Sequence, residues 1–312
     1  MKMKIAILGT GAIGSIIATF ASLSQNDHEI HLIGRKKRLD PIKNQGLVYK
    51  PYNWKEESEW IGTTGYQIHE TIQGLQEIDV VFCAMKAHGL HAALESAKKL
   101  IDVNSPKIVL AMNGLGLRDI ASEFSKDENI IETIAFYPSR LEGNVVLNTG
   151  GNAFFIAEGT TTARDVLGKV YAGSPVDMRF DGTFRKAQWK KAIINTGINA
   201  ISAITMLPVG QILSREPLAV LIKENIREAT TVAEACGIKF EEDLVEVFWG
   251  FASKDPDHIP SMQQDFTRHK LTEIAYLNGY IAEKGRERGI ATPANEAITC
   301  LIQLLEKKLI KL

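Results

Sequence analysis

The sequence lacks an excess of either charge. Its 312 residues include 36 Lys and Arg against 37 Asp and Glu, which gives a formal net charge of −1. Proteins that bind nucleic acids or anionic membranes broadly need a surplus of basic residues on one face. The balance therefore indicates a protein that binds neither nucleic acid nor a membrane surface.

Cysteine is also scarce. Cys83, Cys236 and Cys300 lie far apart, and no CxxC motif or Cys/His cluster accompanies them. A structural zinc site needs closely spaced ligands, and a chain of this length can form its core without disulfides. We therefore predict no bound metal, and three reduced cysteines of the kind found in the cytoplasm.

Long apolar runs are absent as well. No segment approaches the roughly 18 to 20 apolar residues of a membrane span. The N-terminal MKMK and the apolar residues after it resemble a secretory signal, but Gly9, Gly11 and Gly14 interrupt the run where such a signal is most hydrophobic. We expect a cytoplasmic protein.

The first half of the chain alternates short apolar segments with helical stretches. A helix is predicted over about 12–23, and the polar and aromatic stretch 46–66 is either a hairpin or a surface loop. Such alternation predicts a parallel, doubly wound sheet, with strands buried on both faces. The predicted strands are 5–9, 29–34, 79–85, 107–112, 130–137, 152–157 and 176–180.

Strand signals end near residue 182, and only amphipathic stretches follow. The fold class is thus α/β: a doubly wound Rossmann-type domain over 1–181, followed by an all-helical domain over 182–312. No flexible linker separates the two domains, so we expect a ligand-binding cleft between them. The predicted helices are 184–206, 216–236, 241–251, 262–288 and 293–308.

A glycine-rich loop follows the first predicted strand. The residues Gly9-Thr10-Gly11-Ala12-Ile13-Gly14 fit the pattern G-x-G-x-x-G between an apolar strand and an apolar helix. In this context the glycines allow a tight turn, close approach of a pyrophosphate, and close packing of helix on strand. A turn that serves packing alone is the alternative. We predict that Gly9, Gly11, Ala12, Ile13 and Gly14 bind a dinucleotide.

The end of the second predicted strand carries basic residues. An NAD-binding domain usually places Asp or Glu there for the ribose 2′-hydroxyl, whereas this chain has Gly34-Arg35-Lys36-Lys37-Arg38. A guanidinium can bind a 2′-phosphate through two hydrogen bonds. A solvated basic turn is the alternative. The sequence therefore favours NADP(H), with Arg35 as the first candidate and its basic neighbours as helpers.

Two further candidates follow later strands. Lys86 lies just after the predicted strand 79–85, and Asn113 just after 107–112. Ligands of open α/β sheets bind at the carboxyl ends of the strands, where both residues would lie. Each residue alone is equally well explained as a polar strand terminus.

The first helix of the second domain carries a polar stripe. Lys191, Asn195 and Asn199 recur every four residues among alanines and isoleucines, so they share one helix face. Buried polar groups are unfavourable without partners. A lysine in line with two asparagines suits binding and protonation of a carbonyl or carboxylate, although asparagines can also simply join helices. Glu273 and Ser261 are weaker candidates, with a solvated glutamate and a helix cap as the alternatives.

Together these segments resemble the ketopantoate reductases (2-dehydropantoate 2-reductases) over nearly the whole chain. The resemblance rests on ILGTGAIGS, IGRKKR, CAMKAHG, MNGLG, WKKAIINTGINA and SM…LTEIAYLNGY. It implies NADPH-dependent reduction of 2-dehydropantoate to pantoate, a step of pantothenate biosynthesis.

The resemblance also implies a role for each candidate residue. Lys191 would be the catalytic lysine that protonates the forming alkoxide, and Glu273 would lie near the reacting centre. Lys86 would line the cofactor site, and Ser261 would bind the substrate carboxylate. The asparagines of the cofactor and substrate cleft would be Asn113, Asn195 and Asn199.

The chain departs from the family pattern in two places. His258 stands where family members commonly carry a substrate-binding asparagine, and the segment 135–152 differs from their glycine-rich run. Two alternatives therefore stay open: a reductase of another small 2-oxo acid, and a non-catalytic NADP(H)-binding sensor. The sequence is compatible with a homodimer.

Overall fold

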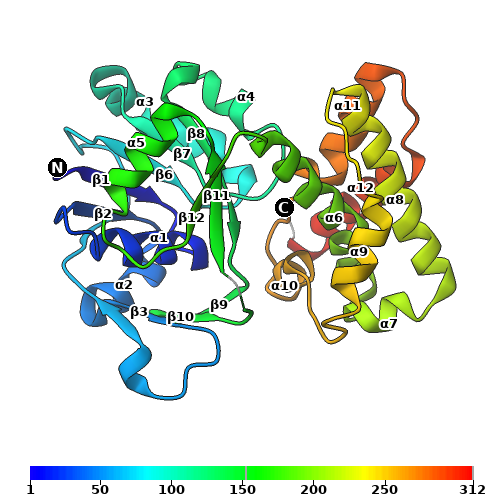
Figure 1. Ribbon diagram of the computed structural model, residues 1–312, viewed down its shortest axis with the longest axis horizontal. Coiled ribbons are helices and arrows are strands. Elements are labelled where there is room, and N and C mark those ends of the chain that lie inside the picture. Colours follow the sequence, from blue (N-terminus) through cyan, green and yellow to red (C-terminus); the bar gives the residue numbers. More distant parts are fainter. Residues whose placement is uncertain (152, 311–312) are drawn as a thin grey trace. The chain divides into compact units, whose positions relative to one another are not determined.

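The computed structural model describes residues 1–151 and 153–310. The contacts divide the chain into two compact units (Figure 1). An α/β unit comprises Met1–Asn113 and Leu117–Phe184, and a helical unit comprises Gly114–Gly116 and the residues from Arg185 onward. In the described residues, no helix is long and apolar enough to cross a membrane.

The main sheet of the α/β unit has the strand order β12-β11-β8-β7-β6-β1-β2-β5. The strands from β8 to β5 in this order are all parallel, as predicted. The prediction that the whole sheet is parallel is wrong at one edge. Strand β11 pairs antiparallel with β8, and β12 pairs parallel with β11, so both run opposite to the other strands. The bounds are β1 Lys4–Leu8, β2 Glu29–Ile33, β5 Gln67–His69, β6 Val80–Cys83, β7 Lys107–Leu110, β8 Ile130–Phe136, β11 Phe154–Glu158 and β12 Met178–Asp181.

A second sheet, with the order β4-β3-β10-β9, lies beside the main one. Its strands are β3 Leu47–Lys50, β4 Ile61–Thr63, β9 Ser139–Glu142 and β10 Val145–Asn148. Strands β3 and β4 pair antiparallel, so the stretch 46–66 is a hairpin, the first of the two predicted possibilities. The pairing of β3 with β10, nearly 100 residues away, carried no sequence signal.

Helix α1 (Ala12–Ser22) packs against strands of both sheets (Figure 1). Its buried residues share one core with alternate residues of the main sheet, such as Ile5 and Ile7 of β1. The intervening residues of β1 are equally buried, so both faces of this strand are covered. This burial explains the near-continuous apolar runs. The other helices of the unit are α2 Lys36–Gln45, α3 Leu90–Asn104, α4 Leu117–Ser122 and α5 Thr161–Val170.

The helical unit has its own hydrophobic core. It contains no strand among its described residues, which confirms the predicted α/β class with a helical second half. The helices are α6 Phe184–Thr205, α7 Val209–Leu213, α8 Glu216–Ala235, α9 Leu244–Ala252, α10 Ser261–Thr267, α11 Asn278–Arg288 and α12 Pro293–Ile310.

The largest error in the helix prediction concerns 262–288, which is not one helix. The chain leaves α10 with His269 at a positive φ of 51°. The backbone N–H of Thr272 then donates to the carboxylate of Glu306 in α12, over 2.7 Å. A hydrogen bond to a distant helix thus replaces the local helical pattern.

Two smaller differences concern α9 and α2, and one predicted strand falls partly outside the described residues. Helix α9 begins at Leu244 because the side chain of Asp243 caps it, accepting from the N–H of Val245. Helix α2 was not predicted. The predicted strand 152–157 begins at Asn152, outside the described residues, and β11 starts at Phe154.

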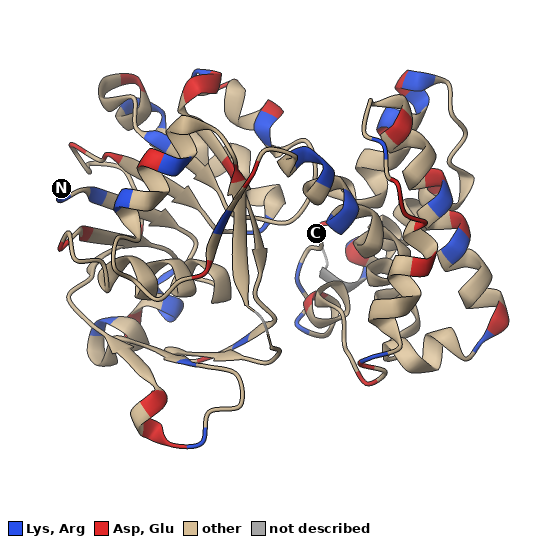
Figure 2. Ribbon diagram, viewed as in Figure 1, with Lys and Arg blue, Asp and Glu red and all other residues tan. Residues whose placement is uncertain are grey.

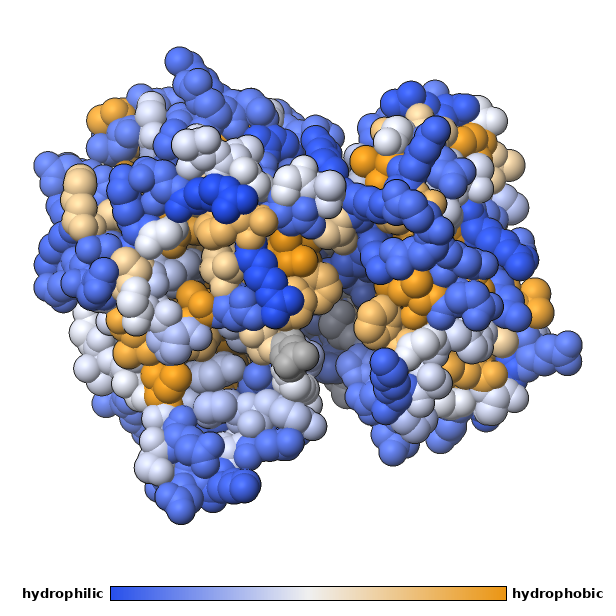
Figure 3. Space-filling view, in the orientation of Figure 1, coloured by the Kyte–Doolittle hydropathy of each residue, from blue (hydrophilic) through white to orange (hydrophobic). Residues whose placement is uncertain are grey.

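Charged residues of both signs are spread over each unit (Figure 2). On the face seen in Figure 3, hydrophilic residues cover most of each unit, and hydrophobic residues form small groups among them. All three cysteines are free, as predicted, and Cys83 is buried in β6.

Candidate active site

The predicted cofactor residues of the α/β unit follow one edge of the main sheet. The register aligns Leu8 with Ile33 of β2 and with Cys83 of β6, and Cys83 with Leu110 of β7. These four residues end parallel neighbouring strands. Gly9, Arg35, Lys86 and Asn113 each follow within three residues of such an end. The carboxyl edge of an open parallel sheet is where ligands of such folds bind.

The glycine-rich loop packs tightly against neighbouring backbone at two of its three glycines. Gly9 has a φ of 95°, and a Cβ on it would lie 2.7 Å from the backbone nitrogen of Met85. A Cβ on Gly14 would lie 1.9 Å from the carbonyl oxygen of Gly9. Both positions therefore need glycine for the fold itself.

Gly11 differs from the other two glycines. It caps α1, and a Cβ built on it would meet no atom of the protein within 4 Å. Packing thus gives no reason for glycine there, but open space beside a free helix N-terminus is what a bound diphosphate requires. The first turn of α1 also contains no acidic residue that would repel an anion.

The basic residues after β2 divide into two kinds. Arg35 is exposed and is the N-cap residue of α2, where no side chain caps the helix. Arg38 instead turns back to the glycine-rich loop. Its Nε donates to the carbonyl of Thr10 over 2.6 Å, and its Nη2 donates to Ser15 Oγ over 2.9 Å. The sequence did not separate these roles: Arg38 holds the loop, whereas Arg35 remains available to a ligand.

Asn113 ends the first segment of the α/β unit, and the next three residues belong to the helical unit. The N–H of Leu115 donates to the carbonyl of Tyr276 over 2.9 Å. Gly114 has a φ of 111°, and a Cβ there would lie 2.7 Å from the Cβ of Tyr276. This packing is not among the features predicted from the sequence, although the glycines of the motif NGLG are its signal.

In the helical unit, α6 carries the predicted stripe. Lys191, Asn195 and Asn199 all lie within this helix, so their four-residue spacing places them on one face. Asn199 is buried and Asn195 partly buried, and among the described residues neither amide has a hydrogen-bond partner. Buried amides are usually paired within the protein, so these two are suited to pair with a ligand.

Lys191 has the most strongly perturbed charge at this site. Desolvation by burial lowers the pKa of Lys191 from its ordinary 10.5 to about 8, and the negative charge of Glu273 opposes that shift. Glu273 is itself buried, just before the short turn Ile274–Tyr276. The structure therefore brings these two predicted catalytic residues together within one unit. A lysine with a pKa near neutrality can exchange its proton readily, which is typical of active sites.

Buried hydrogen bonds connect α6 to the segment that carries Glu273. The amide Nδ2 of Asn278, at the start of α11, donates to the backbone carbonyl of Thr196 over 3.1 Å. It also lies 3.0 Å from Oδ1 of Asn295 in α12. Both asparagines are fully buried. This network fixes the backbone between Asn195 and Asn199.

Ser261 is the first residue of α10 and is exposed. His258 lies three residues earlier in the chain and is also exposed. Its Nδ1 is 3.5 Å from the carboxylate of Asp255. No group of three or more His, Cys, Asp or Glu residues in the described part of the chain could hold a metal ion.

Two family models match this chain. The model of ketopantoate reductase PanE/ApbA matches residues 5–160, and that of its C-terminal domain matches residues 183–306. The chain belongs to the ketopantoate reductase family. As a member, it is an oxidoreductase, and the resemblance inferred from its motifs is confirmed.

Named relatives cover nearly the whole chain. A 2-dehydropantoate 2-reductase of Streptococcus pyogenes is 27% identical over 97% of this chain and 98% of its own length. That of Lactococcus lactis is 26% identical over 98% and 99%.

Two solved structures are also similar to this chain over nearly its whole length. A PanE/ApbA family ketopantoate reductase from Ralstonia eutropha is 26% identical with a TM-score of 0.87, covering 98% of this chain and 99% of that one. A D-mandelate dehydrogenase, solved with NADH and anilino(oxo)acetate, is also 26% identical, with a TM-score of 0.83 and the same coverage. The family is thus settled by the family models, whereas proteins of similar identity to this chain are named for different substrates, 2-dehydropantoate and D-mandelate.

Proposed function

We propose that this protein reduces 2-dehydropantoate to pantoate with NADPH. The observation that carries the proposal is Lys191, whose pKa is lowered to about 8 beside Glu273, on the helix face that also holds Asn195 and Asn199. Reduction of a ketone needs a proton donor for the developing alkoxide, and a lysine with this pKa can act as a general acid near neutral pH.

The residues of the α/β unit fit a nicotinamide dinucleotide. The open space at Gly11 and the free N–H groups at the start of α1 suit a diphosphate. Arg35 stands at the uncapped N-terminus of α2, where a guanidinium and a helix dipole both favour a 2′-phosphate. Lys86 and Asn113 follow β6 and β7 at the same edge and would hold the remainder of the cofactor. When bound, the cofactor supplies the hydride that reaches the ketone carbon.

The residues of the helical unit would orient the substrate and move the proton. Lys191 Nζ would give a proton to the ketone oxygen, while the negative charge of Glu273 stabilises its charged form. The amides of Asn195 and Asn199, which have no hydrogen-bond partner among the described residues, would bind the oxygens of the substrate. The hydroxyl of Ser261, exposed at the start of α10, would bind its carboxylate. We further propose that the enzyme works in the cytoplasm, in keeping with its three free cysteines.

A second candidate is the reduction of a different 2-oxo acid, and one observation favours it. The D-mandelate dehydrogenase, solved with an aryl 2-oxo acid analogue and NADH, is as similar in sequence as the ketopantoate reductase from Ralstonia eutropha. His258 also stands where the family commonly has a substrate-binding asparagine.

The deciding experiment compares substrates and cofactors directly. We would measure kcat/KM with NADPH and with NADH for ketopantoate, benzoylformate and a series of aliphatic 2-oxo acids. A clear preference for ketopantoate with NADPH supports the proposal. A preference for benzoylformate supports the second candidate. If no 2-oxo acid is reduced while NADPH still binds, a non-catalytic sensor becomes the better interpretation.

A further inference from the structure

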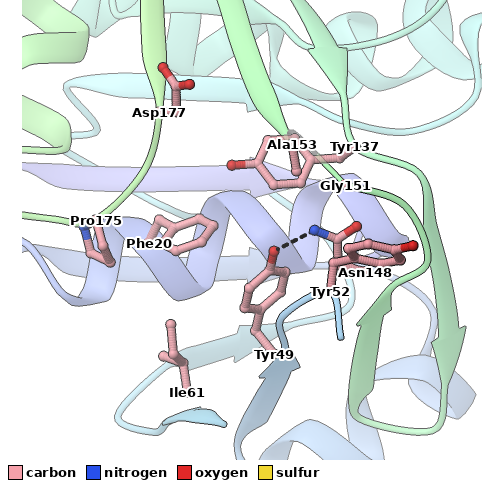
Figure 4. Close-up of a pocket in the computed structure, with 10 residues that line it drawn as sticks. All are labelled: Phe20, Tyr49, Tyr52, Ile61, Tyr137, Asn148, Gly151, Ala153, Pro175 and Asp177. Carbon is pink, nitrogen blue, oxygen red and sulfur yellow. Dashed lines mark hydrogen bonds between the residues drawn. The ribbon is translucent and has the colours of Figure 1, made fainter. Parts of the chain in front are cut away.

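The α/β unit contains an open pocket that lies apart from every residue assigned above. Its volume is about 410 Å³, and none of the predicted cofactor or substrate residues lines it. Its walls include Phe20 of α1, residues of the second sheet, and Ala153 and Asp177, which precede β11 and β12 (Figure 4). A volume of this size accommodates a molecule of one or two rings.

Aromatic side chains form the walls of this pocket. Phe20 of α1 packs edge-on against Tyr49 of β3, with ring centroids 5.2 Å apart, and lies 6.4 Å from the ring of Tyr137. Tyr137 in turn packs against Phe155 at 4.7 Å. All four residues are buried in the core, so their rings are held in place before any ligand arrives. Rigid aromatic walls favour a planar ring, since little conformational freedom is lost on binding.

Of the three tyrosines that line the pocket, Tyr49 and Tyr137 are buried, and their hydroxyl groups differ in their hydrogen bonds. The hydroxyl oxygen of Tyr49 accepts a hydrogen bond from Nδ2 of Asn148, over 3.1 Å. Tyr137 is only 8% exposed, and Figure 4 shows its hydroxyl directed into the pocket. Among the described residues this hydroxyl has no hydrogen-bond partner. Buried tyrosine hydroxyls usually have a hydrogen-bond partner, so the hydroxyl of Tyr137 is suited to donate to an acceptor atom of a bound ligand.

The charges around the pocket disfavour an anion. Among the described residues of the lining, Asp177 is the only acidic one, and none is a lysine or arginine. Burial, together with the nearby Tyr49 and Asp177, raises the pKa of Tyr137, so its phenol stays protonated. Asp177 is itself paired with Arg179 over 2.6 Å, which leaves no unpaired carboxylate for a cationic ligand. The remaining class is an uncharged molecule.

We propose that this pocket binds an uncharged planar molecule, an aromatic ring that bears a carbonyl or similar acceptor, with the hydroxyl of Tyr137 as donor. The NADPH and 2-oxo acid of the proposed function are both anionic, so they belong to a different chemical class. The site is a second one and does not rest on that function.

Three probes of similar shape test the charge preference. Acetophenone is neutral, benzoate is an anion and benzylammonium is a cation. Binding to the full-length protein would be followed by saturation-transfer NMR titration. We expect acetophenone to bind more tightly than both charged probes. Equal or tighter binding of benzoate or benzylammonium would overturn the proposal, as would no detectable binding of acetophenone.

Variants then locate the site. Tyr137→Phe removes only the hydroxyl and should weaken acetophenone binding about 3- to 10-fold, the effect of one neutral hydrogen bond. Ala153→Leu fills the pocket and should abolish binding. Tyr171→Phe is the matched control, because Tyr171 is buried in the same core but does not line the pocket. Thermal unfolding of each variant establishes that it is folded. If folded Tyr137→Phe and Ala153→Leu both bind acetophenone like the unaltered protein, the proposal is wrong.

Discussion

The negative charge of Glu273 raises the pKa of Lys191 and so opposes the effect of burial, and the resulting pKa is about 8. The two residues are more than 80 positions apart, one in α6 and the other just before the turn Ile274–Tyr276. Burial disfavours the charged form of Lys191, whereas the carboxylate of Glu273 favours it and offsets part of the shift. This balance sets the pH range in which Lys191 can act as an acid, and two predictions depend on it.

The first prediction concerns the pH dependence of reduction. Below about pH 8 Lys191 is protonated and can supply a proton, and above that value it is increasingly neutral. Ketone reduction should therefore fall as the pH rises through about 8, whereas oxidation of the product alcohol should increase. Steady-state rates in both directions between about pH 6 and pH 10 measure this, with an ordinary lysine titrating near 10.4 as the reference.

The variant Lys191→Ala should lower kcat for reduction by about 10²- to 10⁴-fold, as is typical for loss of a general acid, and should remove the fall near pH 8. Lys190→Ala is the matched control. Lys190 is the adjacent lysine of α6, but it pairs with Glu242 over 2.8 Å. A similar loss in both variants would contradict the assignment of Lys191 as the acid.

The second prediction uses Glu273→Gln, which keeps the shape of the side chain and removes its charge. Because Glu273 raises the pKa of Lys191, its loss should lower that pKa further. The fall in reduction should therefore move to lower pH. The measurement is the midpoint of the pH–rate profile, with Glu242→Gln as a control at a carboxylate that pairs with Lys190. A midpoint that stays in place or rises would show that the interaction does not govern the acid.

Local patterns in the sequence were sufficient to predict the structural features that arise within one helix or one short segment. The glycine-rich loop was predictable because strand, turn and helix follow one another within about 20 residues. The stripe of Lys191, Asn195 and Asn199 was predictable because helical geometry alone places them on one face. The pKa of Lys191 was predictable only in direction, since its value depends on packing and on Glu273.

Features that depend on distant contacts were not predictable. Helix α2 carries Pro41 in its interior, and proline normally opposes a helix. The segment 262–288 has apolar residues at helical spacing, but the hydrogen bond from Thr272 to Glu306 interrupts it. The aromatic pocket joins Phe20, Tyr49 and Tyr137, which the sequence keeps far apart. The last two features depend on contacts between residues that are far apart in the sequence.

The third prediction compares two glycines of the same loop. Gly14→Ala places a Cβ 1.9 Å from the carbonyl oxygen of Gly9, so we expect the free protein to lose about 1–3 kcal/mol of unfolding free energy or more. Gly11→Ala meets no protein atom, and its φ of −70° suits alanine. It should cost only about 0.5–1 kcal/mol, the usual effect of alanine at a helix N-cap.

Dinucleotide binding should respond in a different order. The Cβ of Gly11→Ala would occupy the space proposed for the diphosphate, and loss of one charge-assisted hydrogen bond there corresponds to about a tenfold rise in Kd or more. Chemical denaturation and isothermal titration with NADPH separate the two effects. Normal NADPH affinity in a stable Gly11→Ala protein would show that the loop serves packing alone.

The last prediction addresses the choice between the two cofactors. Arg35 is exposed at the N-cap of α2, whereas Lys37, two residues later, is exposed within the helix. A charge-assisted hydrogen bond contributes about 1.5–3 kcal/mol, so Arg35→Ala should raise the KM for NADPH about 10- to 100-fold and leave that for NADH nearly unchanged. Lys37→Ala should change the KM for NADPH much less. It also removes one positive charge, but Lys37 does not lie at the N-cap of α2. Arg38→Ala should instead weaken the binding of NADPH and of NADH to a similar extent, because Arg38 holds the glycine-rich loop through hydrogen bonds to Thr10 and Ser15. Equal changes for NADPH and NADH in Arg35→Ala would mean that the 2′-phosphate is bound elsewhere.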